Sequence, residues 1–155
     1  MKKLKAGEVV FVVPERPSQE VVLDFPPLYD EIAAVFRIHE RRDVVFSFGR
    51  RLYNPHQVTI PADIVAHEAI HGARQGTGAE VIDWWKRYME DQPFRLVEEV
   101  YAHRAEYQWL IEHCARRRRR RALKQVAARL ASPLYGGLVT AAQARKLLKA
   151  AIYAA

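Results

Sequence analysis

Two histidines four positions apart, with a glutamate directly after the first, are the residues of this sequence with the clearest chemical potential. His67, Glu68 and His71 lie in the stretch DIVAHEAIHGARQ. On a helix, residues four apart are separated by about 40° around the axis and about 6 Å along it, so both imidazoles can reach a common ion. Glu68 lies about 60° from His71, close enough to reach a water on that ion without binding the ion itself. The spacing therefore predicts a zinc-binding helix, with His67 and His71 as ligands and Glu68 as the general base of a hydrolase.

The residues around the two histidines favour this interpretation over an ordinary amphipathic helix whose histidines make local hydrogen bonds. The neighbouring side chains are uncharged and mostly apolar, so the helix can be buried with its polar residues turned toward a site. These neighbours are Ile64, Val65, Ala66, Ala69, Ile70 and Ala73.

A catalytic zinc ion also needs a third protein ligand and an open position for water. The metzincin continuation of the motif is absent, because Arg74 and Thr77 occupy the places of its glycine and third histidine. The remaining arrangement takes the third ligand from a glutamate on a later helix. The stretch FRLVEEVYAHRAEYQ offers Glu98 and Glu99 for this role.

Helical periodicity favours Glu99 over Glu98. The face that carries Glu99 continues with a small residue one turn on, and then with His103 and Glu106, which could orient the ligands. The face that carries Glu98 continues with Tyr101, a bulky ring that would crowd the zinc helix. We therefore predict one Zn²⁺ per chain, bound by the two histidines and Glu99, with His103 beside it in the active site.

The stretch AHEAIHGARQ, followed by WWKRYMEDQPFRLVEEVYAHRAEYQ, resembles small metallopeptidases of the gluzincin type that phages and bacteria encode. The resemblance covers roughly residues 53–108 and implies a minimal zincin-like fold that hydrolyses peptides or proteins. It implies zinc ligation by His67, His71 and one downstream glutamate, and a turn of the form EVYA favours Glu99. Larger gluzincins have an aspartate four residues after the ligand glutamate to orient the first histidine, whereas this chain has Ala102 or His103 there.

In the predicted mechanism, Glu68 accepts a proton from the zinc-activated water and returns it to the leaving amine. The tetrahedral oxyanion also needs a hydrogen-bond donor, and His103, Tyr101 and Tyr107 all lie within two turns of the glutamate pair. The sequence does not choose among these three. The strand VVFSFG, residues 44–49, is expected either to bind an extended peptide at a sheet edge or to be an ordinary core strand.

A second candidate function comes from six consecutive arginines, which carry six of the seven net positive charges of the chain. Such a run is usually a solvated face, but it can also contact nucleic acid or an acidic partner. In this alternative the protein is a non-catalytic or structural zinc protein, and the peptidase and the partner contact can also coexist. The arginine run consists of Arg116, Arg117, Arg118, Arg119, Arg120 and Arg121.

Length and composition predict one globular domain over residues 1–155, because half of the residues are hydrophobic and 28% are charged. The apolar run near the N-terminus, residues 9–13, is too short for an export signal or a membrane span. We therefore expect a cytoplasmic protein without membrane contact, in the host cytoplasm if a phage encodes it. The lone Cys114 excludes an intramolecular disulfide.

The pattern along the chain predicts an α+β fold, with a small sheet and one helix in residues 1–60 and a mainly helical part in residues 61–155. We expect the helix that carries the two histidines to begin after Pro61, and the next helix to bury a tryptophan stripe. The glutamate helix starts near Asp91, and its pattern continues to residue 113 or through the arginine run to residue 130. Expected strands lie at 8–13, 43–49 and either 51–53 or 57–60, and expected helices at 26–38, 61–75, 79–90, 94–113 and 140–155.

Overall fold

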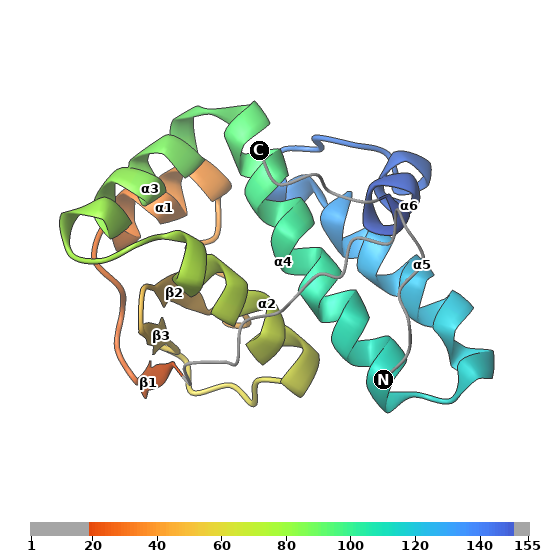
Figure 1. Cartoon of the computed structure of the whole chain (residues 1–155). Coiled ribbons are helices and arrows are strands. Elements are labelled where there is room, and N and C mark those ends of the chain that lie inside the picture. The colour runs from red at the N-terminus through yellow and green to blue at the C-terminus, as the bar shows by residue number, and fades with distance from the viewer. Residues whose placement is uncertain (1–18, 151–155) are drawn as a thin grey trace.

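The computed structural model describes residues 19–150 and has an α+β fold, as expected from the sequence pattern (Figure 1). Its small sheet contains β1 (Glu20–Val22), β2 (Phe46–Phe48) and β3 (Arg51–Tyr53), in the order β1-β3-β2. β1 runs parallel to β3, and β2 runs antiparallel to it. Gly49 lies in the tight turn between β2 and β3 with φ +59°, a backbone conformation that favours glycine.

The expected strand at 43–49 is paired only over β2, and of the two alternatives that follow, 51–53 forms the strand. Residues 57–60 do not, because the Asn54 side chain bonds both the N–H and the carbonyl oxygen of Val58 and closes a loop there. The expected strand at 8–13 lies outside the described residues. β1 was not predicted from the sequence, because three residues are too few to show an alternation of apolar and polar side chains. Their extended conformation comes from pairing with β3.

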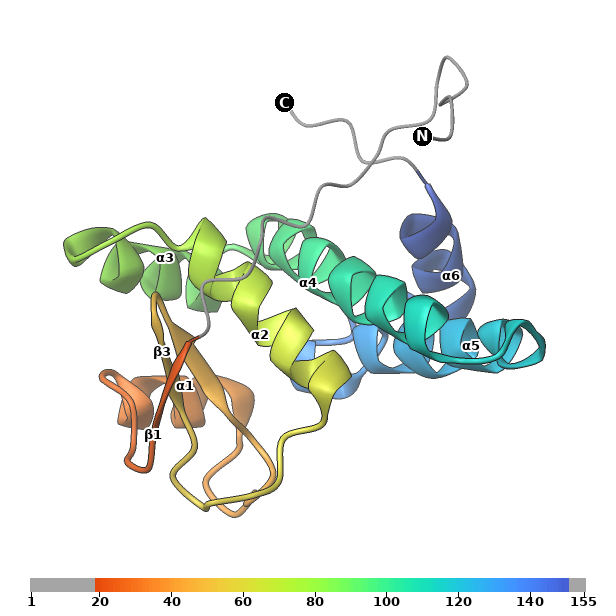
Figure 2. The same ribbon diagram turned by 60° about the horizontal axis from the view of Figure 1, so that its bottom comes forward.

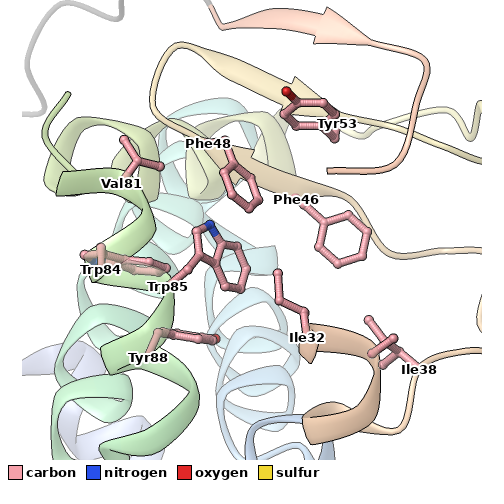
Figure 3. Close-up of a cluster of buried hydrophobic side chains, with 10 residues drawn as sticks. Ile32, Ile38, Phe46, Phe48, Tyr53, Val81, Trp84, Trp85 and Tyr88 are labelled. Carbon is pink, nitrogen blue, oxygen red and sulfur yellow. The ribbon is translucent and has the colours of Figure 1, made fainter. Parts of the chain in front are cut away.

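A first hydrophobic core forms where two helices cover the sheet. These helices are α1 (Tyr29–Phe36) and α3 (Ala79–Glu90). The tryptophan stripe of α3 is buried as predicted, and the Trp85 ring stacks on Phe48 of β2 with 5.2 Å between the ring centroids. Figure 3 shows Ile32 of α1 and Phe46 of β2 closing the same core from the other side.

The helical part is built around two helices that cross, α2 (Ala62–Arg74) and α4 (Gln92–His113). α2 lies between the sheet and α4 and contacts both (Figure 2). α5 (Arg119–Leu130) and α6 (Ala141–Lys149) pack on the far side of α4 and form a second hydrophobic core with it. No helix within residues 19–150 combines the length and the apolar character that a membrane span requires.

The glutamate helix does not continue through the arginine run, so the longer of the two expected extents is wrong. α4 ends at His113, Cys114 is extended, and a short 3₁₀ turn, Arg116–Arg118, leads into α5. The chain turns back there, which allows Leu123 and Val126 to pack in the core that contains Val100 of α4. The free energy gained by burying this apolar face outweighs the local preference for one continuous helix across the turn.

The predicted starts of α4 and α6 are confirmed by their caps. The Asp91 side chain accepts a hydrogen bond from the Phe94 N–H at the start of α4. Thr140 and Gln143 form the predicted capping box at the start of α6. Within the described residues α6 ends at Lys149, short of the expected residue 155.

Candidate metal centre

The two histidines of α2 lie side by side in the interior of the protein. His67 and His71 are only 5% and 6% exposed, and their Nε2 atoms are 3.2 Å apart. The sheet fixes this helix, because the Ser47 hydroxyl on β2 donates a hydrogen bond of 2.6 Å to the carbonyl oxygen of Glu68. Gly72 allows the close approach, since a Cβ there would lie 2.3 Å from the carbonyl oxygen of Gly49.

Glu99 of α4 faces both histidines across the helix crossing. Its Oε1 lies 3.1 Å from His71 Nε2, and its Oε2 lies 3.6 Å from His67 Nε2. The Tyr88 hydroxyl of α3 donates a short hydrogen bond to Oε1, whereas Oε2 makes no hydrogen bond of good geometry within residues 19–150, although His103 Nδ1 lies 3.2 Å from it. One atom from each of these two histidines and Glu99 lies within 4.8 Å of the others. Two imidazole nitrogens and one carboxylate, with an acceptor atom still unsatisfied, fit the three protein ligands of a catalytic zinc site.

The neighbouring Glu98 points away from this cluster. Its carboxylate forms a paired contact with Arg74, at 2.8 and 2.9 Å, and accepts a hydrogen bond from Trp84 Nε1 at 3.2 Å. The structure thus brings Glu99, rather than Glu98, to the two histidines, as helical periodicity suggested.

Glu106, two turns after Glu99, holds the far side of the first histidine. Its Oε2 lies 3.2 Å from His67 Nδ1, and its other oxygen forms an ion pair with Arg129 of α5. Arg129 also lies 3.4 Å from Asp63 in the first turn of α2. With an acceptor on Nδ1, neutral His67 keeps its Nε2 lone pair free to bind a metal, so Glu106 is placed to orient this imidazole. Glu106 stood on the expected face of the helix, but nothing in the sequence pointed to Arg129.

His103 lies behind the ligands and not at an open position. It is 1% exposed, and its Nδ1 lies 2.8 Å from the carbonyl oxygen and 3.2 Å from the Oε2 of Glu99. Its Nε2 lies 3.9 Å from Glu106 Oε2. His103 thus bonds the backbone of Glu99 and lies against both carboxylates, and its expected part in the active site stays a prediction.

His67, His103 and Glu106 form a second group with ligand atoms within 4.8 Å of one another. An ion there would have to displace the contact between His67 Nδ1 and Glu106, whose charge Arg129 already balances. This group is better explained as the support of the first set than as a second metal site.

The charged groups of the cluster change one another's pKa values. Burial opposes protonation of His67, but the hydrogen bond to Glu106 and the carboxylates of Glu99 and Glu68 outweigh it and raise the pKa of His67 to about 9. Burial likewise opposes ionisation of Glu99, yet the nearby histidines hold its pKa well below the usual value. Burial raises the pKa of Glu68, whose Oε1 lies 4.0 Å from His67 Nε2.

A cavity of about 170 Å³ opens onto this cluster, with Glu68 and both histidines in its wall. Two tyrosines that the sequence did not single out for chemistry also line it, Tyr88 and Tyr135. Burial, together with the negative charges of Glu99 and Glu68, raises the pKa of Tyr135 well above its usual value, so its phenol stays a hydrogen-bond donor. Tyr135 is held at the cavity by a 3₁₀ turn, Pro133–Tyr135, that ends at Gly136 with φ +99°.

Tyr101 and Tyr107, two of the three side chains considered from the sequence as oxyanion donors, do not line this cavity. The Tyr101 ring lies under the Arg74 guanidinium, 3.7 Å from its carbon to the ring centroid. Tyr107 packs against the core between α4 and α5. Tyr101 lies two residues and Tyr107 eight residues after Glu99, but the helix directs them to other faces.

β2 is both an edge strand and a core strand. It lies at one end of the sheet order, yet Phe46, Ser47 and Phe48 are all buried. The carbonyl oxygen of Ser47 already accepts hydrogen bonds from Gln75 and Trp85. A bound peptide could therefore pair only with the part of the chain before Ser47.

The arginine run is separated from the cavity. All six side chains are exposed, at the turn between α4 and α5, and none of them lines the cavity wall.

Comparison with family models, with curated proteins and with solved structures found no match to this chain.

Proposed function

We propose that this protein is a zinc metallopeptidase with a minimal zincin-like fold and a gluzincin ligand set. The observation that carries the proposal is the meeting of His67, His71 and Glu99 from two crossing helices at the wall of a cavity that also contains Glu68. Three protein ligands beside a cavity are typical of catalytic zinc, whereas structural zinc usually has four.

When bound, zinc supplies the Lewis acidity that makes a water molecule nucleophilic near neutral pH and polarises a peptide carbonyl. Glu68 is the base in this proposal. Its carboxylate reaches within 4.0 Å of His67 Nε2 but belongs to neither ligand group, so it can accept the proton of the attacking water. Because burial raises its pKa, the protonated form is stable enough to pass the proton to the leaving amine.

Tyr135 is the proposed donor to the tetrahedral oxyanion. It lines the cavity and stays protonated, and it comes from a turn that is not part of the ligand helices. Tyr88 is less suited to this role, because its hydroxyl is held in a short hydrogen bond to Glu99, whereas Tyr135 interacts more weakly with that carboxylate.

The alternative, binding of nucleic acid or an acidic partner through the arginine run, is supported by the exposure of these side chains. The exposure is equally expected of a solvated charged surface. The metal centre gives a more specific chemical prediction.

The test combines metal analysis with hydrolysis of a library of quenched fluorescent peptides. We expect one zinc ion per chain in the native protein and in Glu68→Gln, and hydrolysis only in the native protein. His67→Ala should lose the zinc, while the matched control His113→Ala, an exposed histidine of α4, should retain both zinc and activity. Hydrolysis by Glu68→Gln at the native rate would contradict the assigned base, and a zinc-loaded native protein that cuts no library peptide would contradict the peptidase proposal.

A further inference from the structure

The net positive charge of the chain lies entirely in its C-terminal third. Residues 107–155 contain eleven lysines and arginines and one acidic residue, whereas residues 1–106 contain fourteen basic and seventeen acidic residues. The turn from α4 into α5, which carries the arginine run, lies at the end of the molecule away from the sheet (Figure 2). This concentration of positive charge would attract a polyanion.

The six arginines are not stabilised by other residues of the fold. Their side chains are exposed, and none forms an ion pair or a side-chain hydrogen bond with another residue of 19–150. Arg119, Arg120 and Arg121 form the first turn of α5, where no acidic residue lies and where the helix dipole disfavours cations. Neighbouring like charges also repel one another. The run therefore lowers the stability of the free protein, and a bound polyanion would offset this cost.

An aromatic pair lies immediately before the arginine run, at the end of α4. The rings of Trp109 and His113 are stacked, with 4.0 Å between their centroids and 8° between their planes. The His113 Nδ1–H donates a hydrogen bond of 2.7 Å to the carbonyl oxygen of Trp109, which fixes the orientation of the imidazole. Trp109 is half-buried and His113 is exposed, so a further flat ring can continue the stack on the imidazole.

The stacked pair and the arginine run are close enough to bind one ligand. Three residues separate His113 from Arg116, and a fully extended chain of this length spans at most about 11 Å. Phosphates along one strand of a nucleic acid helix follow one another every 3.4 Å or so, so this distance corresponds to roughly three nucleotides. A single strand could therefore reach both features.

The chemistry of the two features favours nucleic acid over other polyanions. The guanidinium fork matches phosphate, and bases of a single strand stack on aromatic rings. An acidic protein would pair with the arginines but would leave the stacked rings unused. A polybasic segment binds a membrane stably only with a second, apolar anchor, and the larger apolar side chains of α5 are buried against α4 and α6.

We infer that the turn between α4 and α5 binds single-stranded nucleic acid, with phosphates on the arginine run and a base stacked on the Trp109–His113 pair. The inference goes beyond the proposed peptidase function and does not depend on it, because none of these residues lines the cavity of the metal centre. The surface would bring the protein to nucleic acid while the metal centre stays accessible.

The first test compares ligands by fluorescence anisotropy of labelled 20-unit probes: oligothymidylate, oligouridylate, a DNA duplex and polyglutamate. We expect a single strand to bind more tightly than the duplex, although the duplex carries twice as many charges per unit length. Binding of either strand supports the inference, and the tighter of the two identifies DNA or RNA as the preferred class. Tighter binding of the duplex, or equally tight binding of polyglutamate, would overturn the inference.

The second test measures the contribution of the arginines from the dependence on salt. Four to six phosphate contacts on a single strand give a slope of about −3 to −4, so binding should weaken roughly 60- to 250-fold between 50 and 200 mM salt. A triple variant of the run should reduce this slope by about 2. Its substitutions are Arg116→Gln, Arg118→Gln and Arg120→Gln.

A matched control removes the same charge from exposed basic residues elsewhere in the described chain. Its substitutions are Arg42→Gln, Arg50→Gln and Lys86→Gln. The control should keep the native slope. Equal slopes in the two triple variants would place the binding outside the arginine run and overturn the inference.

The third test removes the aromatic pair. The double variant Trp109→Ala with His113→Ala should bind a single strand roughly 5- to 100-fold more weakly and the duplex unchanged, since stacking of one base contributes a factor of this order. Phe25→Ala, at an aromatic residue that is 45% exposed, is the matched control. If the double variant does not fold, His113→Glu tests the same contact at the exposed ring alone. Native affinity for the single strand in a folded variant of this pair would overturn the inference.

Discussion

Replacement of Glu99 by alanine should weaken zinc binding, whereas replacement of Glu98 by alanine should lower the stability of the fold. The two residues are adjacent and both buried, but only Glu99 faces His67 and His71. We expect Glu99→Ala to weaken zinc binding by at least about a hundredfold, since loss of a group that merely orients a ligand already costs 10- to 100-fold. That factor corresponds to at least roughly 2.7 kcal/mol of binding free energy.

Glu98→Ala should leave zinc affinity nearly unchanged and lower the stability of the fold. Breaking a fully buried ion pair costs about 3–5 kcal/mol, but the Arg74 side chain is 35% exposed, so solvent screening reduces this contribution to about 1–2 kcal/mol. The Trp84 N–H also loses its acceptor, which costs about 1–3 kcal/mol. The total of roughly 2–5 kcal/mol predicts a melting temperature about 4–20 °C lower.

Both variants are assayed by competition with a chromophoric zinc chelator and by thermal unfolding of the zinc-free proteins. The native protein and the exposed-site variant Glu112→Ala are the controls. If Glu98→Ala emptied the site and Glu99→Ala left it occupied, α4 would have to be rotated by about 100° from its position in this structure. The orienting roles of His103 and Glu106 would then fail as well.

Three further predictions follow from the same cluster. Glu106→Gln should weaken zinc binding about 10- to 100-fold, and Arg129→Gln should weaken it less, because Arg129 acts through Glu106. Chelator competition measures both affinities, and native affinity in Glu106→Gln would refute the orienting role. Tyr135→Phe should keep its zinc and its KM but lower kcat about 10²- to 10³-fold, and an unchanged kcat would exclude it as the oxyanion donor. The zinc-free protein should lose about 3 kcal/mol of stability between pH 6.5 and 9, because the folded-state pKa of His67 is raised from 6.5 to about 9. Protonation of His67 stabilises the fold fully below the pKa of the unfolded chain, and this stabilisation is lost as the pH rises through the pKa of the folded protein. Denaturant unfolding at pH 6, 7.5 and 9.5 measures this loss, and a flat profile would show that His67 is not protonated in the fold.

The sequence by itself determined the features that depend on local helix geometry. The spacing of His67 and His71 is sufficient to put both side chains on one face of α2, and the same periodicity separates the face of Glu99 from that of Glu98. The buried tryptophan stripe and the capping box of α6 were predicted for the same reason, since each depends on residues within a few positions along the chain.

Only the tertiary structure decided which distant side chains complete the site. Helical periodicity predicts the face on which a residue lies but not which helix covers that face. Arg129 and Tyr135 lie near the site because α5 packs back along α4 and the following 3₁₀ turn reaches the cavity. The contact between His67 and Glu106 spans 39 residues and depends on the crossing of α2 and α4. Such contacts are set by the burial of apolar faces that lie far apart in the sequence, and this burial energy is a property of the packed molecule and not of any local pattern.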